Sequence, residues 1–179
     1  MKILKTILVV VLALVGIVLL IAAFIKKEYA VEREITINKP KMEVFNYVKL
    51  LKNQDNFSVW AMMDPNMEKG FTGTDGMVGA VSSWKSTNKD LGAGEQEILG
   101  ITEGEKIDFE LRFKEPFESK DHAFMSTTSV NDSTTLVKWG FDGKMDYPMN
   151  IMLLAMDMDK MLGDQLQKGL DNLKMVMEK

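Results

Sequence analysis

The amino-acid sequence predicts an α+β protein: an apolar N-terminal helix followed by one domain, a curved seven-stranded antiparallel sheet wrapped on a long C-terminal helix. Three observations support this fold class. Residues 7–25 contain no polar or charged side chain. Short runs with a two-residue hydrophobic period fill much of residues 29–143, and residues 150–177 carry apolar side chains at helical spacing. We therefore divide the chain into an anchor, residues 1–27, and a domain, residues 28–179.

The apolar stretch at residues 7–25 has the length of a membrane span, because crossing the hydrocarbon layer takes about 20 apolar residues. Lys2 and Lys5 precede it, and Lys26 and Lys27 follow it. A cleaved signal peptide has a shorter apolar stretch, of about 7 to 15 residues, and small residues at a cleavage site. The sequence therefore favours an uncleaved single-pass transmembrane helix, expected in a bacterial cytoplasmic membrane. Lysines on both flanks leave the side of the domain undecided.

The domain is expected to open with a strand and a short helix. Residues 29–37 alternate, with Arg33 the one charged residue on the otherwise apolar face. Asn38-Lys39-Pro40 ends this strand, and residues 41–51 have the spacing of an amphipathic helix. Residues 53–66 combine turn formers with aromatic and methionine residues, which is typical of an irregular connection folded over apolar surface.

Six further strands are expected within residues 68–143, separated by short turns. Short turns favour hairpins, so these strands should form an antiparallel meander. The last expected element is a helix from Asn150 to Met177 whose apolar side chains form one stripe. It is the only element long enough to cover the apolar face of the sheet. A bent sheet wrapped around a helix leaves a cavity wherever side chains do not fill the space.

The composition excludes several kinds of partner and cofactor. Residues 28–179 carry 18 basic and 26 acidic side chains, a net charge of −8. We expect no nucleic acid partner, because phosphate binding needs clustered lysine and arginine. The chain has no cysteine and one histidine, so thiol nucleophiles and zinc-thiolate or iron–sulfur sites are excluded. No metal and no cofactor are predicted.

Several segments together resemble one family. They are VEREITINKPKMEVFNYV at 31–48, FTGTDGMVGAVSSW at 71–84, GAGEQEILGITEGEKIDFELRF at 92–113, and TLVKWGFDGKM at 135–145. The domain is similar, over nearly its whole length, to the SRPBCC superfamily of polyketide cyclases and START-like proteins. The resemblance implies a helix-grip fold like that of the birch pollen allergen. It also implies a deep hydrophobic pocket between the sheet and the C-terminal helix, used by relatives to hold lipids, sterols, polyketides or hormones.

Large aromatic and methionine side chains are the candidate ligand-binding residues, because they would bound such a pocket. Methionine is unusually frequent, and its flexible thioether fits irregular apolar ligands. We therefore take the following residues as the candidate site: Trp60, Trp84, Phe109, Phe113, Trp139, Phe141, Met152 and Met156.

Three functions remain open at this stage. The first is membrane-anchored binding of a hydrophobic small molecule or lipid, without catalysis. The second is a cyclase- or dehydratase-like enzyme in which Asp64, Asp108 or His122 acts as a base inside the pocket; against it, alternation along residues 107–113 places Asp108 on the solvent face of its strand. The third is an interaction protein with a filled core. A cavity of about 300 Å³ or more would favour the first.

Overall fold

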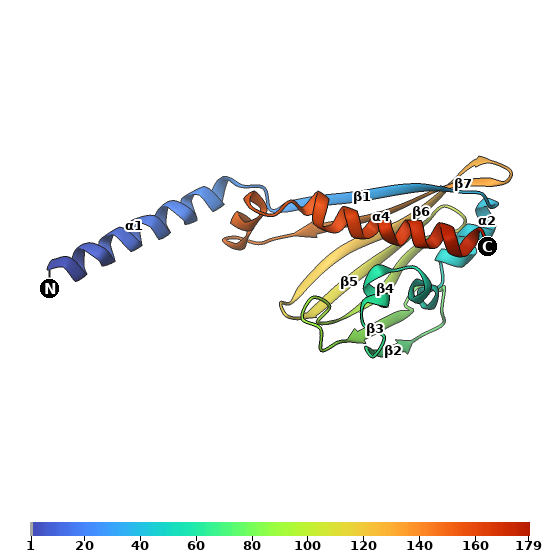
Figure 1. Cartoon of the computed structure of the whole chain (residues 1–179), viewed down its shortest axis with the longest axis horizontal. Coiled ribbons are helices and arrows are strands. Elements are labelled where there is room, and N and C mark those ends of the chain that lie inside the picture. Colours follow the sequence, from blue (N-terminus) through green and yellow to red (C-terminus); the bar gives the residue numbers. More distant parts are fainter. Residues whose placement is uncertain (1) are drawn as a thin grey trace.

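A computed structural model of the protein describes residues 2–179. The helix α1 (Lys2–Phe24) projects from the domain, and three residues join it to the first strand (Figure 1). The remaining elements are β1 (Glu28–Ile37), α2 (Lys41–Val48), the 3-10 helix η1 (Leu51–Asn56), α3 (Val59–Met63), β2 (Glu68–Thr72), β3 (Val81–Lys85), β4 (Ala93–Thr102), β5 (Lys106–Glu115), β6 (Ser119–Asn131), β7 (Thr134–Lys144), the 3-10 helix η2 (Met149–Leu154) and α4 (Met158–Met177).

The seven strands form one antiparallel sheet in the order β1-β7-β6-β5-β4-β3-β2, which confirms the predicted fold class. Strands β2 to β7 follow one another as a meander, and β1 closes the order by pairing with β7. The sheet curves around α4, which lies along its inner face (Figure 1). Because all pairs are antiparallel, the first residues of β1 and β6 lie at the same end of the sheet as the last residues of β5 and β7. We call this the α1 end.

A long C-terminal helix is present, but its predicted start, in the segment from Asn150 to Met177, was wrong. The segment forms η2, a break at residues 155–157, and then α4. The Asp157 carboxylate accepts a hydrogen bond from the backbone N–H of Lys160 at 3.0 Å and caps the new helix. Because an aspartate at this position satisfies one of the free N–H groups of a helix start, it begins α4 at Met158.

Arg33, the one charged residue on the otherwise apolar face of β1, binds α4. Its guanidinium donates to both carboxylate oxygens of Asp159, at 2.8 and 2.9 Å, and to the backbone carbonyl of Asp159 at 2.9 Å. A Cβ atom on Gly163 would lie 2.1 Å from the Arg33 Nη2 atom, so only glycine leaves room for the guanidinium against α4. The charged residue on an apolar face is therefore a contact between sheet and helix.

The Arg33–Asp159 ion pair makes the stability of the folded domain depend on pH. Hydrogen bonds from Arg33 lower the pKa of the Asp159 carboxyl. Since the unfolded value is about 3.9, the pair stabilises the fold fully above that pH and loses this effect as the pH falls through the lower folded-state value. We expect the free energy of unfolding of Asp159→Asn to lie below that of the wild type near neutral pH, and the gap to close in acid. Urea denaturation of both full-length proteins in detergent at several pH values measures this difference in the free energy of unfolding. A difference independent of pH would contradict a stabilising role for the ionised Asp159 carboxylate.

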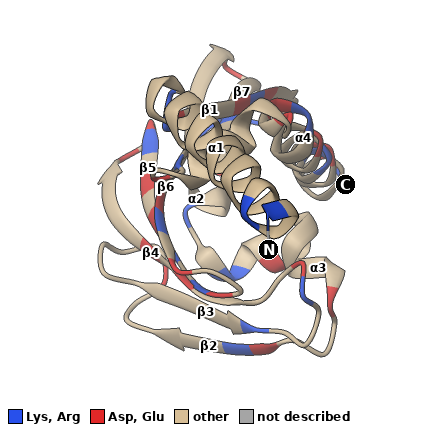
Figure 2. Cartoon of the chain, turned by 90° about the vertical axis from the view of Figure 1, so that its left-hand side faces the viewer, with Lys and Arg blue, Asp and Glu red and all other residues tan. Residues whose placement is uncertain are grey.

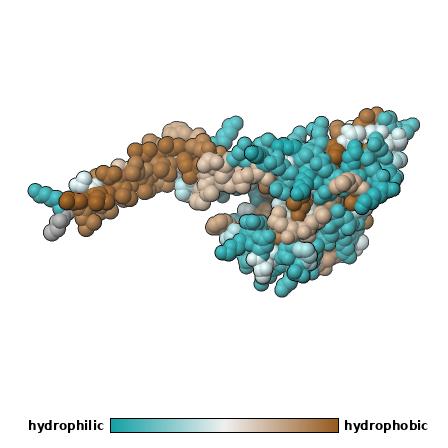
Figure 3. All heavy atoms as spheres, in the orientation of Figure 1, coloured by the Kyte–Doolittle hydropathy of each residue, from teal (hydrophilic) through white to brown (hydrophobic). Residues whose placement is uncertain are grey.

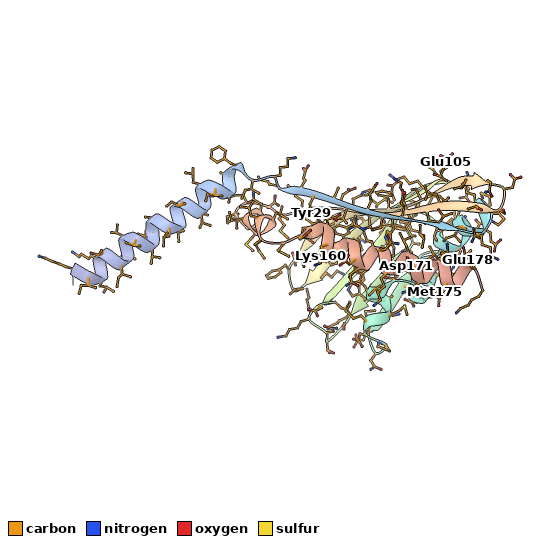
Figure 4. The ribbon with its side chains drawn as sticks, turned by 45° about the horizontal axis from the view of Figure 1, so that its top comes forward. Tyr29, Glu105, Lys160, Asp171, Met175 and Glu178 are labelled. Atoms are coloured by element: carbon orange, nitrogen blue, oxygen red, sulfur yellow. The ribbon has the colours of Figure 1, made fainter. Side chains whose placement is uncertain are left out.

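The half of the domain away from α1 holds the filled core. There, α2 and the second half of α4 pack on the inner face of the sheet (Figure 1). The side chains buried there include Ile37, Val44, Phe45, Val48, Ile98, Ile107, Phe109, Met125, Val137, Leu170 and Leu173. Figure 4 marks the two ends of the domain, with Tyr29 at the α1 end and Glu178 at the other. At the α1 end, side chains leave part of the space between the sheet and α4 unfilled.

Candidate functional site

A cavity of about 450 Å³ lies at the α1 end, between the inner face of the sheet, the η1–α3 segment and the first half of α4. Most of its wall is apolar. Leu111 and Phe113 come from β5, Phe141 from β7, and Leu162 and Leu166 from α4. Side chains alternate between the two faces along a strand, so the charged residues between these positions on β5 and β7 lie on the outer face of the sheet.

Trp139 lines the cavity and also belongs to the buried core. Its ring meets the edges of Phe57 and Trp60, with centroids 5.6 and 5.9 Å away. A Cβ atom on Gly169 would lie 2.7 Å from the Trp139 ring, so a glycine allows α4 to pack closely over the indole. Trp84 forms a side wall: its ring packs edge-on against Phe113 at 5.9 Å. All three tryptophans of the chain therefore line the cavity.

The structure brings five of the eight candidate residues together around this cavity: Trp60, Trp84, Phe113, Trp139 and Phe141. Phe109 is fully buried in the core, because it lies nearer the start of β5. Met152 and Met156 also do not line the cavity. They belong to η2 and the break after it, which lie beside the C-terminal end of α1 rather than on α4. Whether the five that line the cavity contact a ligand stays a prediction.

The cavity wall also includes polar and charged residues: Tyr29, Gln54, Asp55, Ser58, Lys69, Ser82, Ser83, Asp90, Gln96, Glu115, Ser119 and Asp121. The Nε2 atom of Gln54 is buried and has no hydrogen-bond partner among the described residues. Burial, and then the charge of Asp121, raise the pKa of the Tyr29 hydroxyl to about 12, so it stays protonated. Sequence reasoning missed Gln54 because it lies in η1, within the segment predicted only as an irregular connection. No periodicity marked which of its side chains point inward.

The three residues considered as catalytic bases lie outside the cavity. His122 and Asp108 are on the outer face of the sheet, where the His122 Nε2 atom is 2.9 Å from Asp108 and its Nδ1 atom is 2.8 Å from Asp142. Asp64 accepts hydrogen bonds from the Ser86 hydroxyl and from the backbone of Asn66. A base must reach the proton it removes, so none of the three can act on a molecule held in the cavity.

The outer face of the sheet carries an ion-pair network centred on Arg112, which confirms the predicted outward orientation of the charged residues of β5. Arg112 donates to Glu95, Glu97 and Glu110 at 2.6 to 2.7 Å. Hydrogen bonds from Lys114 and Arg112 lower the pKa of Glu95. Among residues 2–179, no group of three or more histidine, cysteine or acidic side chains is arranged to hold a metal ion.

Solved structures share this architecture at low sequence identity. Mll3558 from Rhizobium loti aligns with a TM-score of 0.60 at 16% identity, covering 82% of this chain and 95% of that one. CV1439 from Chromobacterium violaceum gives 0.59 at 13%, covering 84% and 97%. Ara h 8.0201 gives 0.55 at 13%, also covering 84% and 97%. The domain has the helix-grip fold. No family model matches the chain, and no curated protein matches its sequence.

The helix-grip fold agrees with the fold implied by the resemblance to the SRPBCC superfamily. At these identities the likeness concerns the fold alone, because one fold supports many unrelated activities. The cavity is therefore the feature from which we infer a function.

Proposed function

We propose that the chain is a membrane-anchored helix-grip protein that binds a small hydrophobic molecule or lipid in the cavity between its sheet and α4. The observation that carries this proposal is the cavity of about 450 Å³. Ligand sites of drug-sized molecules span about 300 to 1,000 Å³ and are mostly apolar, with a few polar groups that orient the ligand. The wall described above is also mostly apolar. An interaction protein with a filled core would have no such space.

Binding without catalysis is favoured over a cyclase- or dehydratase-like activity by the placement of the candidate bases. Asp108 and His122 face solvent on the other side of the sheet, and Asp64 lies outside the wall. The cavity-facing Tyr29 keeps its proton at neutral pH, because its pKa is raised rather than lowered. It therefore acts as a hydrogen-bond donor rather than a base.

The proposed ligand carries a hydrogen-bond acceptor at one end. A buried N–H group without a partner costs free energy, and a carbonyl or carboxylate oxygen placed beside Gln54 Nε2 would remove that cost. The apolar remainder of the ligand would lie against Trp139, Leu111 and Phe141. A fatty acid has both features, which makes it a suitable first probe.

The helix α1 is the proposed anchor. It is long and apolar enough to cross a membrane, and nearly all of its side chains are exposed. A signal sequence passes the same test. An uncleaved anchor is favoured because the helix is held by the domain: Asn150 in η2 hydrogen-bonds the backbone carbonyls of Ala22 and Ile25. The intact mass of the membrane-bound protein separates the two, since cleavage would remove these residues.

Titration with cis-parinaric acid, a fluorescent fatty acid, tests the ligand proposal. Energy transfer from the three cavity tryptophans reports its binding to the full chain in detergent. We expect saturable transfer in the wild type. Gln54→Leu should weaken binding about threefold to tenfold, because one hydrogen bond contributes about 1 kcal/mol. Gln167→Leu is the control, because Gln167 is half-buried on α4 and does not line the cavity. Absence of saturable transfer in the wild type would overturn the proposal.

A further inference from the structure

We take the exposed part of the cavity wall at the α1 end of the domain as an opening of the cavity. The turn between β5 and β6 contributes Pro116 and Phe117 to its wall, and the loop between β3 and β4 contributes Asp90 and Leu91. Phe117 is 78% exposed, so this part of the wall is a rim rather than interior. Figure 2 views the molecule from the α1 side, with the turns at this end of the sheet toward the viewer. The N-terminal helix therefore leaves the domain from the same end as the opening.

The junction between α1 and η2 sets the direction of the helix relative to the domain. Asn150 is fully buried, and its Nδ2 atom donates to the carbonyl oxygens of Ala22 at 2.7 Å and Ile25 at 3.0 Å. Ala22 lies in the last turn of the helix and Ile25 directly follows the helix, so this side chain joins the end of α1 to η2; the Ala22 carbonyl also accepts a hydrogen bond from the Ile25 N–H at 3.3 Å. Ala22 is also fully buried, against η2. The helix is thus fixed to the domain at its last turn rather than attached by a free linker.

Large apolar side chains are exposed at this end, on segments that are not part of α1. Phe117 lies in the β5–β6 turn, and the others lie in or just before η2. We call the set the apolar rim: Phe117 (78% exposed), Tyr147 (45%), Met149 (54%), Met152 (40%) and Leu154 (67%). Figure 3 shows the apolar surface of α1 continuing to the junction, while much of the domain surface in that view is hydrophilic. Lys26 and Lys27, which are exposed, follow the apolar helix directly, where headgroups would lie.

We propose that the apolar rim lies in the headgroup layer of the bilayer that holds α1, so that the cavity opens onto that leaflet and takes its ligand directly from it. The inference rests on the anchoring part of the proposed function. Aromatic and aliphatic side chains at the membrane boundary are stabilised by leaving water, whereas the same groups exposed in solution are not. The Asn150 cap maintains this orientation because it prevents the domain from turning about the end of α1.

The chain has no cysteine, so single-cysteine variants place a probe at one site without background. Phe117→Cys and Leu154→Cys test the rim. Val130→Cys is the control, since Val130 is apolar and 59% exposed but lies next to the β6–β7 turn at the opposite end of the sheet. Each full-length variant carries an NBD fluorophore in phosphatidylcholine vesicles that include phospholipids with a nitroxide on the acyl chain. We expect strong quenching at positions 117 and 154 and little at 130. Equal quenching at the three positions would overturn the proposal.

A second variant tests the role of the cap. Asn150→Ala in the Phe117→Cys background should lower the quenching at position 117 severalfold, because the domain is then free to turn away from the bilayer. Unchanged quenching would show that Asn150 does not set the orientation of the domain, and would overturn the proposed role of this residue. No fatty acid is added in these measurements, so they are independent of the fatty-acid titration. Flotation of each variant with the vesicles separates a failure of anchoring from a failure of orientation.

Discussion

Replacing Ala123 with phenylalanine is expected to weaken the binding of cis-parinaric acid at least about tenfold, a loss of about 1.4 kcal/mol or more. Ala123 is buried on the inner face of β6, where it lines the cavity beside Phe109 and Phe141. A benzyl group there has an empty space to enter, so it takes up volume that a ligand would need. The same addition in a filled core would cost about 1 to 3 kcal/mol of stability. The tryptophan energy-transfer titration measures the affinity.

Ala30→Phe provides the matched control, because Ala30 is exposed on β1 and its side chain points away from the cavity. We expect it to bind the fatty acid like the wild type. Thermal unfolding of both variants checks that the fold is kept. Wild-type affinity in a folded Ala123→Phe variant would place the ligand somewhere other than this cavity.

Truncating Phe45 to alanine is expected to lower the free energy of unfolding by about 3 to 5 kcal/mol, which is the usual cost for a buried phenylalanine. Phe45 lies on α2 and is fully buried in the core at the end of the domain away from α1. Since native domains are stable by only about 5 to 15 kcal/mol, this change alone would bring the protein close to unfolding. Urea denaturation of the full chain in detergent gives the value.

Met42→Ala is the control for this prediction, because Met42 lies on the same helix but is 45% exposed. It should cost much less than Phe45→Ala. A small effect of Phe45→Ala would mean that the end of the domain described as filled is loosely packed. The distinction between a filled half and a hollow half of the sheet would then be lost.

The sheet was predictable from the sequence because the longer strands, such as β1, β6 and β7, follow a two-residue period and the turns between strands are short. The length and apolar character of α1 were equally plain. The break before α4 was not predictable, because Met152, Met156 and Met158 continue an apolar helical pattern across it. The cap at Asp157 and the contact of η2 with α1 decide the boundary, and both depend on tertiary structure.

The candidate site was predictable in part. Alternation indicated that Phe113 and Phe141 share the inner face with the core residues, but not which end of the sheet is hollow. Phe109 and Phe113 have the same pattern, and only their positions along β5 make one a core residue and the other part of the cavity wall. Gln54 gave no signal at all, because an irregular segment has no period from which to infer the direction of a side chain.

Mass spectrometry of the molecules that copurify with the full chain tests the central claim most directly. We expect an apolar molecule with a hydrogen-bond acceptor, bound in near-stoichiometric amount to the wild-type protein extracted from membranes in mild detergent. It should be strongly reduced in Ala123→Phe and kept in Ala30→Phe. Equal amounts in all three proteins, or no apolar molecule together with no binding of added fatty acid, would contradict a ligand-holding cavity.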